Sequence, residues 1–354
     1  MSDHLRRCAL TPPRAHGAPL GRAILKSMAE DFVVDEVLGF AADGGVGHRL
    51  IQVEKRGVDT LYAVKLLARH AGVSQRDIGF AGLKDRHAVA RQWFTVPAGR
   101  IPVDWSTLAD ERLRVCADEG HSRKLRRGAL RGNRFHLRLR DVQVDPSALA
   151  QRVELLRTQG VPNYFGPQRF GRDGDNITDA LRWSAGGELP RGREARAFVY
   201  SASRSLLFNA VLASRVDGDT WAQLLPGERV NLAGRNSWFV ADAIDETLLE
   251  RLSRHDIHPT GPMPGRGDGP EGEAGDLEKA VLAPYASLVA ALAAEGVDAA
   301  RRALRMVPED CTAEIDGDVV SLTFALPAGS YATMVVRELF DTDAFGEGGE
   351  DASS

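Results

Sequence analysis

The stretch "FAGLKDRHAVARQWF", residues 80–94, joins two apolar segments through a short charged turn. The first segment, residues 78–81, ends at Gly82, where a residue without a side chain lets the backbone bend sharply. The second segment, residues 92–96, alternates apolar and polar residues as a half-buried strand does. The pattern therefore predicts two strand segments with one carboxylate, that of Asp85, at the turn between them.

Asp85 lies among two cations and a histidine, and two interpretations of it differ in consequence. The common one for a K-D-R triplet is a surface ion pair in a turn. The other is a reactive group, because neighbouring cations keep a carboxylate ionised and an ionised carboxylate can act as nucleophile or base. The residues themselves favour the second interpretation without being specific for it.

The strongest charge cluster follows further along the chain. Residues 121–140, "HSRKLRRGALRGNRFHLRLR", hold eight Lys or Arg and two His without a carboxylate, although the net charge of the chain is −4. Local charge decides binding to phosphates, so this stretch favours contact with a phosphate-bearing partner over a solvated surface. Asn133 and Phe135 alternate with Arg134 and point one way on a strand, where an amide and a ring suit a base. The competing interpretation of Phe135 is an ordinary core residue.

Composition sets broad limits. The chain has 354 residues, 43% of them hydrophobic and 27% charged, as expected of a soluble globular protein. It lacks an apolar run of 18 residues and a secretory signal, so we expect no membrane span and a cytoplasmic location. Its three cysteines are far apart, and no phosphate-binding loop, dinucleotide fingerprint or H-E-x-x-H motif occurs, so neither a zinc site nor a nucleotide cofactor is expected.

Strands at both ends of the chain and helices in its middle predict an α+β fold with an insertion. Strands are expected at 22–26, 31–37, 48–56, 78–81, 134–144, 311–315 and 318–326, and helices at 59–72, 146–160, 176–184, 201–215, 275–295, 297–306 and after Ser330. Residues 259–275 read as a long Pro/Gly loop. The composition changes near Gly160 and again near Met306.

Several segments resemble the TruD family of tRNA pseudouridine synthases. They follow the order of the family over nearly the whole chain: "EDFVVDEVLGF" at 30–40, "FAGLKDRHAVARQWF" at 80–94, "RKLRRGALRGNRF" at 123–135, "GVPNYFGPQRFG" at 160–171 and "LPAGSYATMVVREL" at 326–339. The resemblance implies an enzyme that converts uridine 13 of tRNA to pseudouridine without a cofactor. It also implies the pseudouridine-synthase α+β fold, with a mixed, mainly antiparallel sheet.

The resemblance assigns roles to six residues. Asp85 matches the catalytic aspartate and Lys26 the active-site lysine beside it; Phe32, Asn133 and Tyr331 match the lining of the uridine site, and Phe135 the aromatic packed against the base. Two positions depart from the common family pattern, since Ala29 stands where proline is frequent and Tyr331 where phenylalanine is. Both substitutions keep the local shape.

The implied organisation is a discontinuous catalytic domain, residues 1–159 plus 307–354, interrupted by a mainly helical TruD-specific domain at 160–306. The expected partner is tRNA, and the protein is expected to be a monomer. An alternative is a non-catalytic RNA-binding or chaperone module, which would not need Asp85. A metal-dependent nuclease would need clustered carboxylates, and Asp85 has no acidic neighbour nearer than Asp77. Whether the carboxylate attacks C1′ or C6, or abstracts a proton, stays open.

Overall fold

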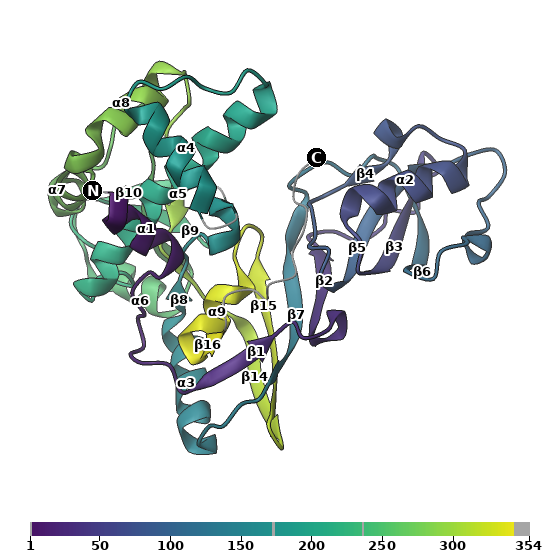
Figure 1. Ribbon diagram of the computed structural model, residues 1–354, viewed down its shortest axis with the longest axis horizontal. Coiled ribbons are helices and arrows are strands. Elements are labelled where there is room, and N and C mark those ends of the chain that lie inside the picture. Colours follow the sequence, from purple (N-terminus) through teal and green to yellow (C-terminus); the bar gives the residue numbers. More distant parts are fainter. Residues whose placement is uncertain (1, 172–173, 236, 343–354) are drawn as a thin grey trace. The chain divides into compact units, whose positions relative to one another are not determined.

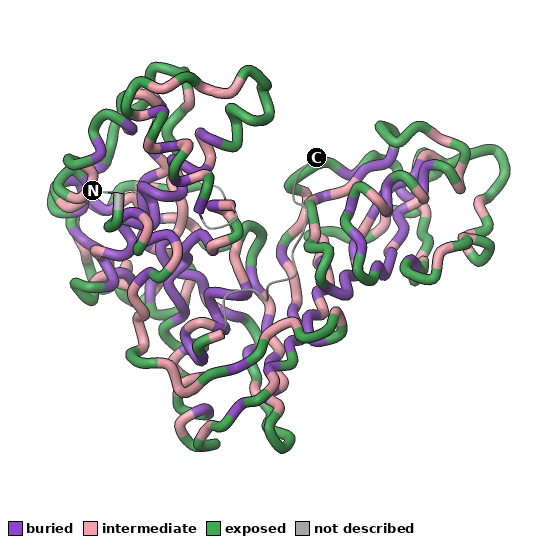
Figure 2. Tube along the Cα trace, viewed as in Figure 1, coloured by how far each residue is buried: buried purple, intermediate pink, exposed green. Residues whose placement is uncertain are grey.

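The computed structural model describes residues 2–171, 174–235 and 237–342, which form two compact units (Figure 1). Of these residues, 19–154, 308–329 and 339–342 form the first unit, here the sheet unit. The second, here the helical unit, comprises 2–18, 155–171, 174–235, 237–307 and 330–338. Buried positions run along the strands of the sheet unit and along the longest helix of the helical unit (Figure 2).

The sheet unit is built on a ten-stranded mixed sheet. Its main strand order is β14-β15-β7-β2-β5-β3-β6, with β1, β16 and β4 paired to it outside this path. The strands are β1 (Arg22–Leu25), β2 (Phe32–Leu38), β3 (His48–Arg56), β4 (Gly79–Phe80), β5 (Val89–Pro97), β6 (Leu113–His121), β7 (Leu130–Arg140), β14 (Glu309–Asp316), β15 (Val319–Pro327) and β16 (Asp341–Thr342). All the strands predicted from the sequence in this unit are present, and the α+β class is confirmed.

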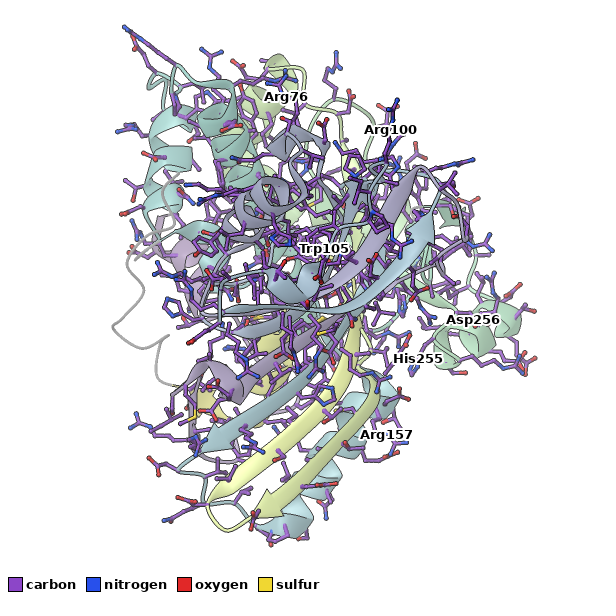
Figure 3. The ribbon with its side chains drawn as sticks, turned by 90° about the vertical axis from the view of Figure 1, so that its right-hand side faces the viewer. Arg76, Arg100, Trp105, Arg157, His255 and Asp256 are labelled. Atoms are coloured by element: carbon purple, nitrogen blue, oxygen red, sulfur yellow. The ribbon has the colours of Figure 1, made fainter. Side chains whose placement is uncertain are left out.

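Helix α2 (Thr60–Ala71) covers one face of the sheet and begins and ends where the sequence predicts. The Asp59 carboxylate accepts a hydrogen bond from the Tyr62 amide, and Gly72 ends the helix in the left-handed conformation. Its apolar side packs on buried strand residues such as Phe94 to form the core of the unit. Trp105, labelled in Figure 3, is partly buried against this core.

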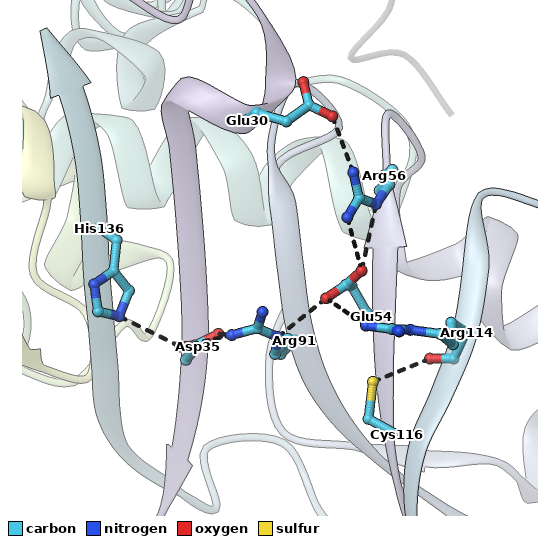
Figure 4. A network of polar contacts seen from close by, with 8 residues as sticks. All are labelled: Glu30, Asp35, Glu54, Arg56, Arg91, Arg114, Cys116 and His136. Atoms are coloured by element: carbon cyan, nitrogen blue, oxygen red, sulfur yellow. Dashed lines mark hydrogen bonds and ion pairs between the residues drawn. The ribbon is translucent and has the colours of Figure 1, made fainter.

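The opposite face of the sheet carries a polar network whose residues come from β7, β2, β5, β3 and β6 (Figure 4). At its centre Glu54, with 4% of its side chain exposed, pairs with Arg56 at 3.0 Å, Arg91 at 3.1 Å and Arg114 at 3.4 Å. Burial raises the pKa of the Glu54 carboxyl, but hydrogen bonds from Arg56 and Arg91 outweigh it and leave the pKa lowered. Arg91 extends the network to Asp35. The network ties the strands together on the side away from α2.

The central strand β7 presents its side chains as the alternation predicts. Phe135, Leu137 and Leu139 are buried, whereas His136 and Arg138 are exposed. Phe135 is opposite Val34 of β2 and Phe324 of β15, so strands from both ends of the chain flank it. Sequence segments separated by nearly 300 residues therefore meet at β7.

The helical unit combines its helices with two small sheets. The helices are α1 (Ser2–Leu10), α4 (Asp175–Ser184), α5 (Arg193–Asp217), α6 (Glu246–Ser253), α7 (Gly272–Leu282), α8 (Ala286–Ala294) and α9 (Ala332–Leu339), and α3 (Pro146–Gln159) leads into the unit from the sheet unit. The strands are β8 (Val161–Pro162), β9 (Glu228–Leu232), β10 (Trp238–Ala241), β11 (Ile257–Met263), β12 (Ala300–Ala303) and β13 (Arg305–Met306). Strands β10-β9-β11-β12 form one sheet and β13-β8 the other.

The sequence prediction was wrong for two strands of this four-stranded sheet, β11 and β12. Residues 297–306 were predicted as a helix but contain β12 and β13, and the start of the predicted Pro/Gly loop is β11. Tertiary pairing outweighs local propensity here. Arg301 of β12 is opposite Pro262 of β11, and the Arg301 guanidinium pairs with Glu278 at 2.6 Å. A strand containing proline is tolerated at positions where no ladder hydrogen bond is donated.

One helical segment among the described residues, 272–294, is long and apolar enough to cross a membrane. Pro284 interrupts it between α7 and α8. Within the unit, Leu288 and Leu292 are buried and Glu278 forms an ion pair. Only 22% of the apolar window is buried, so the expectation of no membrane span stays a prediction.

The units divide near the predicted domain boundaries but group the terminal segments differently. Residues 155–307 form most of the helical unit, close to the expected insert at 160–306. Residues 1–18 and 330–338 pack with it rather than with the sheet. For example, Asn209 of α5 donates a hydrogen bond to the Cys8 carbonyl at 3.1 Å. The division into a catalytic domain and an inserted domain stays a prediction.

Candidate active site

Asp85 lies in the loop between β4 and β5, at the end of the sheet face that α2 covers. Lys26, the residue after β1, donates a hydrogen bond from Nζ to Asp85 Oδ2 at 3.1 Å. The Asp85 side chain is 56% exposed and that of Lys26 only 15%. The structure thus brings together the two predicted residues across 59 positions of sequence, with the carboxylate open to an incoming substrate and the ammonium shielded behind it.

The backbone of Lys26 is itself unusual. Its φ is 65°, in the left-handed region that residues other than glycine seldom adopt. Such conformations cost on the order of 1–3 kcal/mol and persist only where the surroundings hold them. The ammonium is 4.1 Å from the centroid of the Phe32 ring, so a cation–π contact and the ion pair to Asp85 together fix this side chain.

Phe32 and Phe135 form an aromatic layer beside this ion pair. Their ring centroids are 6.0 Å apart at 72°, and Phe324 packs on Phe135 at 5.4 Å. Phe32 is held in place from the preceding residue, because the buried Asp31 carboxylate pairs with Arg140 of β7 at 2.7 Å. The predicted residues Lys26, Phe32 and Phe135 therefore form one chain of contacts that leads to Asp85.

Asn133 is on the same face of β7 as Phe135, two residues away. Its side-chain oxygen is buried, and the described residues offer it no hydrogen-bond partner. A buried polar atom without a partner is costly and is usually matched by a ligand or water. Asn133 is thus placed and chemically equipped to bind a polar group beside the aromatic layer.

Tyr331 belongs to the helical unit, immediately before α9. Its ring packs edge-on against Phe165, with centroids 6.1 Å apart at 65°. Beneath Phe165 is Arg302, whose guanidinium is 4.2 Å from the Phe165 centroid and donates to Asn163 Oδ1 at 2.6 Å. Burial lowers the pKa of Arg302 to about 10. The aromatic segment 163–170 is mostly core, since Tyr164 and Phe170 are buried.

A residue that the sequence analysis did not single out, Lys55, anchors the loop that carries Asp85. The side chain is fully buried at the end of β3, and Nζ donates to the carbonyls of Val58 at 2.8 Å, Asp85 at 3.0 Å and Lys84 at 3.4 Å. Burial lowers its pKa to about 8. Strand alternation could have predicted the burial of Lys55 from the sequence, because this residue lies on the same strand face as the buried residues Ile51 and Val53.

Three further contacts hold the same loop. Lys84 pairs with the buried Glu36 carboxylate of β2 at 2.7 Å. The Lys84 amide donates to Thr60 Oγ1 at 2.9 Å, and Thr60 in turn donates to Gln92 Oε1 at 3.0 Å. Gln92 donates to the Gly82 carbonyl at 2.6 Å. The loop is thus fixed at Gly82, Lys84 and the Asp85 carbonyl by buried polar groups, which limits the positions that the carboxylate can take.

The described residues contain no group of three or more His, Cys, Asp or Glu that could hold a metal ion. Cys116, one of three free cysteines, is exposed and donates to the Arg114 carbonyl. The chemical resources of the site are therefore a carboxylate, an ammonium, an amide and aromatic rings.

Comparison with known proteins identifies the family of the chain. The family model described as tRNA pseudouridine synthase D (TruD) matches residues 17–177 and 186–339, which include every site residue named above. The chain belongs to the TruD family. Members of this family are tRNA pseudouridine synthases, so the protein is an isomerase that acts on tRNA.

Relatives in the TruD family are similar over nearly their full length. The tRNA pseudouridine synthase D of Nitrosococcus oceani is 45% identical over 329 residues, covering 92% of both chains. That of Pseudomonas putida is 46% identical over 341 residues, covering 96% of this chain and 97% of its own. A crystal structure from Methanosarcina mazei, described as TruD, shares the fold with a TM-score of 0.70 at 21% identity, covering 96% of this chain and 98% of its own.

Proposed function

We propose that this TruD-family protein isomerises uridine 13 of tRNA to pseudouridine, with Asp85 as the catalytic carboxylate. The observation that carries the proposal is the 3.1 Å pair between Lys26 and Asp85, in which the carboxylate is the exposed partner. Its loop is anchored by four buried polar side chains, so the carboxylate keeps a fixed direction.

Pseudouridine formation breaks the bond between N1 of uracil and C1′ of the ribose, turns the base, and joins C5 to C1′. A carboxylate can serve as nucleophile or base in this sequence, and a cation beside it holds it in place. The uridine must leave its stack to reach the carboxylate. Phe32 and Phe135 supply an aromatic layer, and Asn133 supplies a hydrogen-bonding group for the uracil edge.

We further propose that residues 160–306 form the inserted domain and contribute to tRNA selection, while residues 1–159 and 307–354 carry the chemistry. All the proposed catalytic groups belong to the sheet unit, and only Tyr331 belongs to the helical unit. The role of Tyr331 in the uridine site stays a prediction from the family resemblance.

The test is incubation with an unmodified tRNA transcript that has uridine at position 13, followed by chemical mapping of pseudouridine at single-nucleotide resolution. A matched transcript with cytidine at position 13 is the control. We expect one pseudouridine, at position 13, and none in the control transcript. Modification at another uridine in both transcripts would contradict the proposed target, and tight binding without isomerisation would favour an RNA-binding module.

A further inference from the structure

The sheet unit contains a cavity of about 770 Å³ outside the set of residues around Asp85. Two loops enclose it, one that follows β2 and one between β6 and β7. Its lining residues are Phe40, Ala41, Asp43, His121, Ser122, Arg123, Lys124, Leu125, Arg126 and Ala129. Neither the family match nor the relatives' names assign this cavity a role.

An aromatic stack forms one wall. Phe40 and His121 are nearly parallel, with ring centroids 5.5 Å apart at an interplanar angle of 16°. His121 is buried, whereas Phe40 is 41% exposed, so the histidine supports one face of the phenylalanine ring. An exposed ring that is held flat from behind is a suitable platform for stacking a nucleobase.

Asp43 fixes this wall to the second loop. Its carboxylate accepts hydrogen bonds from the Ser122 amide at 2.8 Å, the Gly45 amide at 2.9 Å and the Ser122 hydroxyl. These bonds, led by that from the Ser122 side chain, lower the pKa of Asp43 to about 2. His121 Nδ1 is 3.3 Å from the same carboxylate. The Asp43 carboxylate therefore links the two loops through these contacts.

The cations of the lining lie on the second loop. Arg123 and Arg126 are exposed, and Lys124 is anchored through a hydrogen bond to the carbonyl of Arg76, a residue labelled in Figure 3. Arginines near a stacking ring match a nucleotide, which presents a base and a phosphate a few ångströms apart.

The cavity loop is also bonded to the catalytic segment. The Gly128 amide donates to the Ala81 carbonyl at 2.7 Å, four residues before Asp85, and the Arg127 guanidinium is 4.1 Å from the centroid of the Phe80 ring. One RNA strand can therefore contact the catalytic segment and the neighbouring loop.

We infer, on the basis of the proposed function, that this cavity binds a second, unpaired nucleotide of the tRNA, with its base stacked on Phe40 and its phosphate held by Arg123 and Arg126. The site would hold the strand beside the target uridine while that uridine is out of its stack. It recognises a stacked base and a phosphate rather than a particular base, because rings and guanidinium groups tolerate all four bases.

The test is a double-mutant cycle on binding, carried out in full-length Asp85→Asn protein so that the tRNA is not converted. The partners are Phe40→Ala and a set of unmodified tRNA transcripts, each with one abasic nucleotide near position 13. We expect Phe40→Ala to weaken binding about tenfold. One transcript, abasic at a position other than the target, should bind the protein with Phe40 about tenfold more weakly than the intact transcript does. In the Phe40→Ala protein, the same abasic transcript and the intact transcript should bind equally well.

Two controls define the result. Leu61→Ala removes a 50% exposed apolar side chain of α2 that does not line the cavity, and it should couple with no abasic position. Arg100→Gln removes an exposed arginine of the sheet unit that does not line the cavity (Figure 3), whereas Arg123→Gln with Arg126→Gln should weaken binding of every transcript. If Phe40→Ala fails to fold, Phe40→Leu takes its place in the cycle.

Absence of coupling between Phe40 and every abasic position, or unchanged affinity in the double arginine variant, would overturn the inference. Because the cycle measures binding alone, its outcome is separate from the proposed reaction. A wild-type protein that makes pseudouridine but shows no coupling would refute the second site only. Coupling in a protein that makes no pseudouridine would refute the reaction only.

Discussion

At the scale of single residues, Lys26 combines a left-handed backbone, a ring contact and the ion pair to Asp85. We predict that Lys26→Met slows isomerisation by about tenfold to a hundredfold, as expected when a charge-assisted hydrogen bond worth roughly 1.5–3 kcal/mol is removed. Affinity for tRNA should change far less. Single-turnover rates and binding constants measure the two effects separately.

The matched control is Lys65→Met, which removes an exposed lysine of α2 and should leave the rate unchanged. A Lys26→Met protein that binds tRNA poorly but converts bound tRNA at the normal rate would mean that this lysine serves the RNA and not the carboxylate.

The charge of the buried Lys55 side chain changes close to neutral pH, because burial lowers its pKa to about 8. Below that pH the ammonium has three protons for the carbonyls of Val58, Lys84 and Asp85; above it the neutral amine has two. We predict that the activity of the wild-type protein falls as the pH rises through about 8. Lys55→Met should lower the activity at neutral pH and abolish this fall. The pH–rate profiles of both proteins check this, and a fall near pH 8 that persists in Lys55→Met would contradict it.

Stability should respond to Lys55 with the opposite sign. Its pKa is lower in the folded protein than the ordinary value of 10.5, so the unfolded chain binds the proton more tightly. The contribution of Lys55 to the free energy of unfolding therefore rises as pH increases from about 8 toward 10.5. Opposite trends in activity and stability distinguish a positioning role from simple unfolding at high pH.

At the scale of elements, the close approach of β7 and β15 depends on Gly132. A Cβ atom there would be 2.2 Å from the Leu326 carbonyl oxygen, so one strand would have to move. We predict that Gly132→Ala lowers the free energy of unfolding by about 1–3 kcal/mol, as overpacking usually does. Thermal unfolding measures this, with Gly39→Ala as the control, whose Cβ would have an ordinary contact at 3.8 Å. Equal stability of the two variants would show that β7 adapts freely.

The elements that the sequence predicted well are those whose signals are local. The Asp59 cap and Gly72 stop of α2 and the alternation of β7 depend on nearby residues. Strands β11 and β12 were missed because their pairing is decided by distant partners such as Glu278. The pairing of Lys26 with Asp85 likewise needed the family resemblance, since no sequence period joins residues 59 positions apart.

At the scale of the whole molecule, the basic stretch 121–140 is less free than its sequence implied. Acids from other segments pair with three of its cations: Asp31 with Arg140 at 2.7 Å, Asp310 with Arg134 at 2.8 Å and Glu309 with Arg131 at 3.8 Å. These acids are invisible in the stretch itself, because the fold brings them from both ends of the chain.

We predict that tRNA binding still depends on salt through this stretch. Replacing Arg126, Arg127 and Arg131 with Gln should reduce the slope of log K against log salt, by about 0.7–0.9 for each phosphate that an arginine no longer neutralises. Arg114→Gln, on the opposite polar face of the sheet, is the control for a 71% exposed arginine. An unchanged slope in the triple variant would show that these side chains do not touch phosphates.

The most direct measurement is the single-turnover rate of Asp85→Asn on unmodified tRNA, together with its tRNA affinity. The amide keeps the size of the side chain and removes the charge that pairs with Lys26. We predict no detectable pseudouridine and an affinity within a fewfold of wild type, because the loop is held by Lys55, Thr60 and Gln92 rather than by the carboxylate. Turnover by Asp85→Asn near the wild-type rate would contradict Asp85 as the catalytic group.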